Sequence, residues 1–235
     1  HKIVHDGAVL GHEIVAKIVE INSDTNFKID DKIVTSHHIP CGECNYCKHG
    51  NVSMCEHFKK TNIFPGGFSE LVFVSEEHLK NVAYLVPQNM SDEEISFYEP
   101  LGCCVRAIKR CNLQKGDTAL VVGLGSIGLL MGEGLKAMGY KVYGCDLIQE
   151  RIELAQKMGL ENFDFSNQVD AVFMTSGADK AIDTAFKAVR MGGKILVFSS
   201  TPNSNGYPNN EIYYKELTKE DISQTKIRVV KVIAP

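Results

Sequence analysis

Residues 118–138 constrain the fold of this chain more than any other segment. They begin with a short apolar run at 118–122, pass through the glycine-rich sequence GLGSIG at 123–128, and continue as an apolar helical pattern. A short apolar run is typical of a buried parallel strand, and a strand, a tight turn and a helix in this order start a β–α–β unit. The segment therefore predicts an open α/β sheet.

The glycine-rich turn also predicts a nucleotide site. The G-x-G-x-x-G pattern is weak by itself, but it stands here in the strand–turn–helix setting that it needs. Gly123 permits the tight turn, Gly125 lets the backbone approach a pyrophosphate, and Gly128 lets the helix pack closely on the strand. The free N–H groups at the helix start, beginning with Ser126 and Ile127, then bind the pyrophosphate.

Asp146 follows the next predicted strand, 141–145, roughly 20 residues beyond the start of the turn. An acidic residue at this place accepts hydrogen bonds from the adenine-ribose hydroxyls, and its charge repels a 2′-phosphate. We therefore expect NAD rather than NADP, although Arg151 is close enough to soften this preference. The alternative role of Asp146 is to cap the helix predicted at 148–158, and the two roles are compatible.

Further units follow this pair of strands. We expect a strand at 169–174, a helix at 178–190 ended by Gly192 and Gly193, and a strand at 194–198. Ligands of open α/β sheets bind beyond the carboxyl ends of the strands. Residues 175–177 and 199–201 are therefore predicted to line the cofactor crevice.

Four of the eight cysteines lie within 41–55, in the sequence CGECNYCKHGNVSMC. Two-residue spacers let neighbouring sulfurs converge on one tetrahedral ion, and a glycine-containing loop brings in the fourth. Four thiolates without an open position predict a structural zinc site, with His49 and His57 as bystanders. An iron–sulfur cluster and two disulfides are the alternatives. The predicted ligands are Cys41, Cys44, Cys47 and Cys55.

A second candidate metal site is the pair His12 and Glu13, which precedes an apolar segment typical of a strand. Imidazole and carboxylate groups both suit zinc. The pair is a weak signal alone, because ordinary surface or capping residues give the same pattern.

The composition excludes several classes of protein. Hydrophobic residues make up 44% of the 235 residues, too many for a disordered chain, and the net charge of −4 lacks the basic excess of a nucleic-acid binder. No apolar run reaches the ~18 residues of a membrane span. No signal-peptide pattern opens the chain, and reduced thiolates in a metal site favour the cytoplasm.

Taken in order, these motifs resemble those of the zinc-containing alcohol dehydrogenases of the medium-chain dehydrogenase/reductase family, especially its polyol and threonine dehydrogenase branch. The matching pieces are 11–13, 41–55, the GGFSE sequence at 66–70, the EPL sequence at 99–101, and 123–128. The resemblance implies an α/β fold, with a Rossmann doubly wound parallel sheet and a mostly β, GroES-like catalytic domain. The implied organisation is a zinc-bearing catalytic domain at 1–101 with an incomplete N-terminus, an NAD-binding domain at 102–218, and a return strand at 219–235.

The resemblance also implies a catalytic zinc. His12 and Glu13 become its candidate ligands, with Glu99 a further ligand or the partner of the zinc-bound water. The simpler interpretation of Glu99 is a helix-start carboxylate. The family's cysteine ligand is absent from the sequence, and in the family pattern Cys-Gly-x-Asp-x-His the last position falls on His1.

His1 is thereby a candidate relay for the alcohol proton, or else an exposed terminal residue. Cys103 and Cys104 are unsuitable substitutes for the missing ligand, because they follow the EPL sequence in a predicted helix and are expected to be core thiols.

The expected function is therefore an NAD-dependent, zinc-containing oxidoreductase (EC 1.1.1.-) that transfers a hydride between an alcohol or polyol and NAD. The alternatives are a threonine or formaldehyde-adduct dehydrogenase of the same family, and a non-catalytic, zinc-stabilised nucleotide-binding protein. The family implies a homo-oligomer, a dimer or tetramer. The expected partner is a small-molecule alcohol substrate, and the charge and hydropathy favour neither nucleic acid nor a membrane. The particular alcohol is left open.

Two connections are shorter than this fold requires. If 162–165 is a third parallel strand, only 166–168 joins it to the strand at 169, whereas a parallel crossover needs at least ~10–12 residues. Either 162–165 is not a parallel strand, or residues are missing at this point. The second short connection is 219–226. It leads directly to 227–235, which resembles the family's final strand, where the family has further strand and helix segments in between. We interpret the sequence as pieces of a longer protein joined across missing segments, which an intact mass close to 26.0 kDa would contradict.

Overall fold

The computed structural model describes residues 6–199 and 230–231. The chain divides into two compact units, residues 1–100 and 101–235. His1 lies outside the described residues, so its predicted role as a proton relay stays a prediction. None of the helices in the described part is long and apolar enough to cross a membrane.

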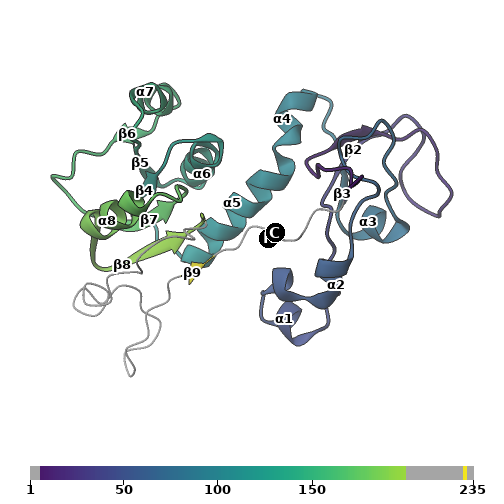
Figure 1. Cartoon of the computed structure of the whole chain (residues 1–235), viewed down its shortest axis with the longest axis horizontal. Coiled ribbons are helices and arrows are strands. Elements are labelled where there is room, and N and C mark those ends of the chain that lie inside the picture. Colours follow the sequence, from purple (N-terminus) through teal and green to yellow (C-terminus); the bar gives the residue numbers. More distant parts are fainter. Residues whose placement is uncertain (1–5, 200–229, 232–235) are drawn as a thin grey trace. The chain divides into compact units, whose positions relative to one another are not determined.

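The second unit contains a six-stranded parallel sheet in the order β6-β5-β4-β7-β8-β9 (Figure 1). Its strands are β4 (Thr118–Val122), β5 (Lys141–Cys145), β6 (Glu161–Asn162), β7 (Val169–Met174), β8 (Val189–Val197) and β9 (Val230–Lys231). The helices are α5 (Tyr98–Cys111), which begins in the first unit, α6 (Ser126–Ala137), α7 (Gln149–Lys157) and α8 (Asp179–Ala188).

Two separate cores show that helices cover both faces of this sheet. Val121 packs in a core with Ile108 of α5 and Met131 of α6, whereas its neighbour Leu120 packs in a second core with Phe186 of α8. Successive side chains of a strand point to opposite faces, so the two cores lie on opposite sides of the sheet. The predicted doubly wound parallel sheet is confirmed.

The chain path differs from the prediction after α8. This helix ends at Ala188 and β8 begins at the next residue, so Gly192 and Gly193 lie within the strand instead of ending the helix. Val189 is extended and buried, and it pairs with Val169. Its β-branched side chain favours this extended, packed conformation over a continued helix. The glycines fall where the pairing of β7 and β8 is irregular, as in a β-bulge.

The connection before β7 also differs from the prediction. β6 is parallel to β5 although residues 163–168, which contain no helix, are all that joins it to β7. Because β6 has only two residues, this loop of up to ~20 Å is long enough for the return (Figure 1). The predicted bounds 162–165 were wrong, because β6 ends at Asn162, and the alternative that this strand is not parallel is contradicted.

The first unit is built on a small antiparallel sheet in the order β1-β2-β3. Its strands are β1 (Val15–Lys17), β2 (Lys32–Thr35) and β3 (Ala83–Leu85). Its short helices are α1 (Asn45–Lys48), η1 (Val52–Met54), α2 (Glu56–Lys60), α3 (Glu76–Asn81) and α4 (Asp92–Ser96). Ile33 and Val34 of β2 are 2% exposed, so the central strand anchors the core of this unit.

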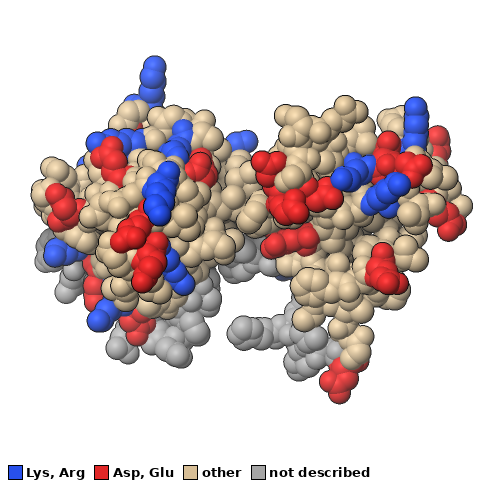
Figure 2. Space-filling view, turned by 90° about the horizontal axis from the view of Figure 1, so that it is seen from above, with Lys and Arg blue, Asp and Glu red and all other residues tan. Residues whose placement is uncertain are grey.

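The faces seen in Figure 2 carry basic and acidic side chains in close proximity. Lys32 forms an ion pair of 2.6 Å with Asp92, and Lys141 one of 3.0 Å with Glu161. The positive charges of these two pairs are thus balanced locally.

Candidate metal centres and nucleotide-binding turn

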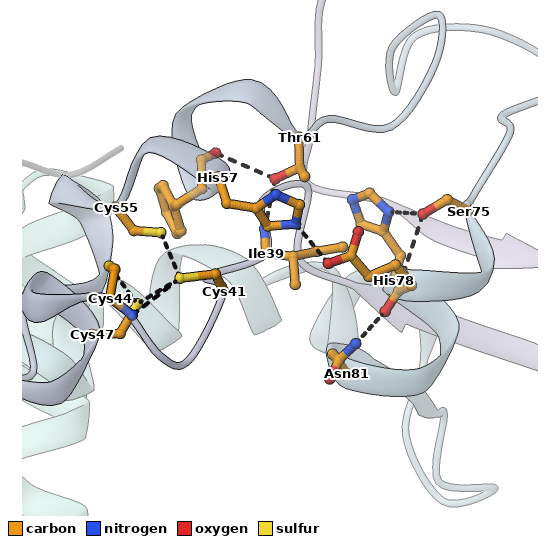
Figure 3. A network of polar contacts seen from close by, with 12 residues as sticks. Ile39, Cys41, Cys44, Cys47, Cys55, His57, Thr61, Ser75, His78 and Asn81 are labelled. Carbon is orange, nitrogen blue, oxygen red and sulfur yellow. Dashed lines mark hydrogen bonds and ion pairs between the residues drawn. The ribbon is translucent and has the colours of Figure 1, made fainter.

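The four predicted cysteines converge in the first unit (Figure 3). The Sγ atom of Cys41 lies 3.9 Å from that of Cys47 and 3.6 Å from that of Cys55, and the Cys44 and Cys47 sulfurs are 3.5 Å apart. Ligands at ~2.3 Å from a tetrahedral zinc would be about 3.8 Å apart. A disulfide would need ~2.05 Å. The geometry therefore fits one tetrahedral ion better than two disulfides.

Local backbone structure supports this convergence. Cys44 and Cys55 are the N-cap residues of α1 and α2, so each sulfur sits where a short helix begins. Amide hydrogen bonds from Cys41 and Phe58 lower the pKa of the Cys55 thiol to about 6. Removal from water and the neighbouring Cys44 sulfur raise the pKa of Cys47 to about 12. Thiols packed this closely cannot all ionise unless a cation balances their negative charge. Such a set is therefore suited to a metal ion.

A second cluster brings together His12, His37 and Glu99, whose ligand-capable atoms all lie within 4.8 Å of one another. The Nε2 atom of His12 is 3.8 Å from Oε2 of Glu99, and Nδ1 of His37 is 3.9 Å from Oε1. These distances are too long for direct hydrogen bonds. They are nearer to the ~3.4 Å that separates two nitrogen or oxygen ligands of a tetrahedral zinc ion.

Three parts of the first unit supply this cluster. His12 precedes β1, His37 follows β2, and Glu99 lies in the first turn of α5. The side chain of Glu99 is 10% exposed and that of His37 is 7% exposed, whereas His12 at 42% remains accessible. The cluster is therefore mostly buried, with one accessible edge.

The structure brings together only part of the predicted catalytic set. Glu13 is exposed and lies outside the cluster. It directly follows His12 in a non-helical segment, so its side chain does not point in the same direction as that of His12. Cys104 is fully buried in the core of the second unit, as predicted for a core thiol, whereas Cys103 is only partly buried, contrary to the prediction. His37 was missed, since its only sequence signal was a His-His pair just before the cysteine motif.

The segment that contains Gly66 and Gly67 is hydrogen-bonded to the backbone directly before His12. The Gly67 amide donates to the Gly11 carbonyl at 2.7 Å, and the Phe68 amide donates to the Leu10 carbonyl at 2.9 Å. A Cβ atom on Gly67 would lie 2.7 Å from Ile14 and 2.9 Å from the Gly11 carbonyl carbon. Only glycine permits this approach, which accounts for the GGFSE sequence.

His78 secures the backbone at His37. Its Nε2 atom lies 3.1 Å from the His37 carbonyl oxygen, and its Nδ1 atom lies 2.7 Å from Oγ of Ser75, the N-cap residue of α3. His78 is 2% exposed, so it is a buried support for the second cluster. Sequence reasoning did not select it.

The glycine turn of the second unit has the predicted steric requirements. Gly123 has a φ of 97°. A Cβ atom on Gly128 would lie 1.9 Å from the carbonyl oxygen of Gly123. Gly125 is the N-cap residue of α6, without a side-chain cap, and nothing lies within 4 Å of the place of its Cβ. The helix start therefore offers its N–H groups and open space to an anion.

Asp146 contacts this turn directly. Its Oδ2 atom accepts a hydrogen bond of 2.6 Å from the Leu124 amide, and its Oδ1 atom accepts one of 2.9 Å from the Ile148 amide. Burial favours a higher pKa for Asp146, but these donors and Arg151 at 3.6 Å outweigh it, so the pKa lies below its ordinary value. The carboxylate thus braces the turn and the start of α7, and it retains unused acceptor capacity.

A parallel sheet with a glycine-rich turn, together with an antiparallel unit that carries a four-cysteine centre, defines a class of zinc-binding dehydrogenases. Residues 2–84 match the family model described as "Alcohol dehydrogenase GroES-like domain", and residues 126–228 match that of "Zinc-binding dehydrogenase". The chain belongs to the zinc-containing alcohol dehydrogenases of the medium-chain dehydrogenase/reductase family. The predicted GroES-like and Rossmann architecture is thereby confirmed.

Individual relatives agree with this assignment. The chain is 28% identical to sorbitol dehydrogenase of Bacillus subtilis over 227 residues, which cover 88% of this chain and 63% of that protein. It is 29% identical to L-threonine 3-dehydrogenase of Serratia proteamaculans, with 89% and 65% covered. The crystal structure of 2R,3R-butanediol dehydrogenase from Bacillus subtilis is similar with a TM-score of 0.76 and 26% identity, covering 89% of this chain and 63% of that one. The chain thus spans less than two thirds of the length of each of these relatives.

Proposed function

We propose that the chain belongs to an NAD-dependent dehydrogenase that oxidises an alcohol or polyol with the help of zinc. The observation that carries this proposal is the cluster of His12 and Glu99, which is distinct from the four-cysteine centre. A scaffold that needs zinc only for stability has no use for a second set of ligands with an accessible edge. The relatives, which include sorbitol and threonine dehydrogenases, support the same reaction class.

His12 and Glu99 would hold the catalytic zinc, and the accessible edge at His12 would admit the substrate oxygen. A bound zinc ion supplies Lewis acidity that lowers the pKa of the substrate hydroxyl. Loss of the hydroxyl proton and transfer of a hydride from the carbinol carbon to the nicotinamide would give a carbonyl product and NADH. Glu13, which is exposed, is no longer part of the ligand set that we propose.

The glycine turn would hold the cofactor. The N–H groups of Ser126, Ile127 and Gly128 at the start of α6 would bind the pyrophosphate, since they face a helix N-terminus without a side-chain cap. The remaining acceptor capacity of Asp146 would serve the ribose hydroxyls, and its negative charge disfavours a 2′-phosphate. These features support NAD over NADP, with Arg151 as the group that moderates the preference.

The four-cysteine centre would hold a structural zinc, because it offers four ligands and no open position. The division into domains at 1–101, 102–218 and 219–235, a homo-oligomeric state and a cytoplasmic location complete the proposal.

The purified full-length protein tests this function. We expect about two zinc ions per chain, and NAD reduction with members of a panel of alcohols, polyols and threonine. Gly125→Ala, which has room for its methyl group, should retain zinc but lose NAD binding. A protein with one zinc per chain and no turnover of any panel member would instead be a non-catalytic nucleotide-binding protein.

A further inference from the structure

We propose that His37 is a third protein ligand of the catalytic metal, so that the centre has a His–His–Glu ligand set. The inference rests on the proposed function, because it concerns the metal that this function requires. His37 lies outside the motifs at 11–13, 41–55, 66–70, 99–101 and 123–128.

The side chains of the cluster are arranged around one point. Glu99 directs Oε1 toward Nδ1 of His37 and Oε2 toward Nε2 of His12, at 3.9 Å and 3.8 Å. The centroids of the two imidazole rings are 4.3 Å apart, and the ring planes are tilted by 48°. The two rings therefore lie next to each other beside the carboxylate. Three donor atoms within 4.8 Å of one another suit a common cation, and both imidazole–carboxylate distances are too long for a direct hydrogen bond.

The donor types match a known kind of zinc site. Catalytic zinc usually has three protein ligands and a fourth position for water or substrate, and two histidines with one glutamate form one such set. His12 and Glu99 supply two donors of such a set, and Glu13 is exposed. Among the described residues, His37, which is buried, supplies the third donor of this cluster.

The backbone that carries His37 is held on both sides, as a metal ligand requires. His78 contacts the carbonyl of His37, and Oγ of Ser36 donates to the carbonyl of His38 at 3.1 Å. The next amide, that of Ile39, donates to Oγ1 of Thr61 at 2.9 Å (Figure 3). The imidazole is therefore presented by a segment with little freedom to move.

The same segment continues into Cys41 of the four-cysteine centre. Thr61 directly follows α2, whose N-cap residue is Cys55. The hydrogen bond between Ile39 and Thr61 thus ties the chain before Cys41 to the end of the cysteine lobe. Zinc binding to the four cysteines would therefore help to hold His37 in place.

Zinc content and cobalt spectra of the purified full-length protein test the inference. His37→Gln should weaken binding of one of the two zinc ions at least ~10-fold and leave the cysteine-bound zinc in place. In protein loaded with Co²⁺ at this centre, the visible absorption of the cobalt should change. His57→Gln is the matched control, since His57 is a partly exposed histidine of the same unit whose Nε2 atom lies 2.6 Å from Oε1 of Glu77 and which is outside the second cluster.

His37→Cys separates loss of a ligand from misfolding. A thiolate can replace imidazole as a zinc ligand, so this variant should regain the second metal ion and add a sulfur-to-cobalt charge-transfer band. If His37→Gln keeps two zinc ions and an unchanged cobalt spectrum, His37 is not a ligand, although the proposed function stands. If the unaltered protein binds only one zinc ion, the proposed function fails as well.

Discussion

The Oδ2 atom of Asp146 lies 2.6 Å from the backbone nitrogen of Leu124, inside the glycine-rich turn. The residue predicted to select the cofactor therefore also shapes the loop that is predicted to bind its pyrophosphate. A substitution at this position should alter stability and cofactor binding together.

Asp146→Asn should lower the free energy of unfolding by about 1–3 kcal/mol, because two amide donors lose an ionised acceptor. We also expect weaker NADH binding. Urea unfolding and calorimetric titration measure the two effects, with the exposed Glu150→Gln as control. Unchanged stability would show that the hydrogen bond to Leu124 contributes nothing.

The glycines of the turn should separate into structural and functional positions. Gly128→Ala forces a methyl group to within 1.9 Å of the Gly123 carbonyl oxygen and should prevent normal folding of the second unit. Gly125→Ala meets no atom within 4 Å and should fold normally but exclude the pyrophosphate. Thermal unfolding and NADH titration compare them, and equal behaviour of the two variants would refute this distinction.

Gly67→Ala should displace the backbone next to His12, because the new Cβ would lie 2.7 Å from Ile14. We expect it to lose the zinc of the His12–Glu99 cluster and to keep that of the cysteines. Zinc analysis checks this, with Leu71→Ala, at an exposed position, as control. Retention of both metal ions would mean that the glycine pair does not position His12.

Asp170 should make the second unit sensitive to acid. Burial favours a higher pKa, but hydrogen bonds from Thr118 and Arg190 outweigh it, so the pKa of Asp170 lies below its ordinary value. The stabilisation is complete above the ordinary carboxyl pKa of ~3.9 and disappears as the pH falls through the lower folded value.

Asp170→Asn should therefore destabilise the protein by about 1–2 kcal/mol at neutral pH, and its difference from the unaltered protein should shrink below about pH 4. Unfolding measured across pH tests this, with the exposed Asp183→Asn as reference. A difference that stays constant down to pH ~2 would contradict the assignment.

Removal of metal should release the cysteine lobe. Its helices α1, η1 and α2 contain four, three and five residues, far below the ~12–15 at which an isolated helix becomes marginally stable. In Cys44→Ser, or after chelation, amides of 41–60 should exchange hydrogen faster, while those of β4 should keep their protection. Unchanged exchange at 41–60 would show that the lobe does not depend on metal.

The sequence determined the features that depend on neighbouring residues. The strands at 118–122, 141–145 and 169–174 were predicted at their observed positions, because an apolar run between polar residues is a local signal. The glycine turn and the convergence of the four cysteines could also be predicted from the sequence. Their spacing within a short segment specifies which backbone groups or sulfurs can meet.

Only the tertiary structure decided what depends on the path of the chain. Val189 continues into a strand past two glycines because its partner Val169 is buried beside it. Likewise, no local pattern brings His37 to Glu99. Their meeting depends on how β2 ends and how α5 begins, and on the hydrogen bond from His78 to the His37 backbone. Contacts between distant segments depend on packing, which residue spacing does not encode.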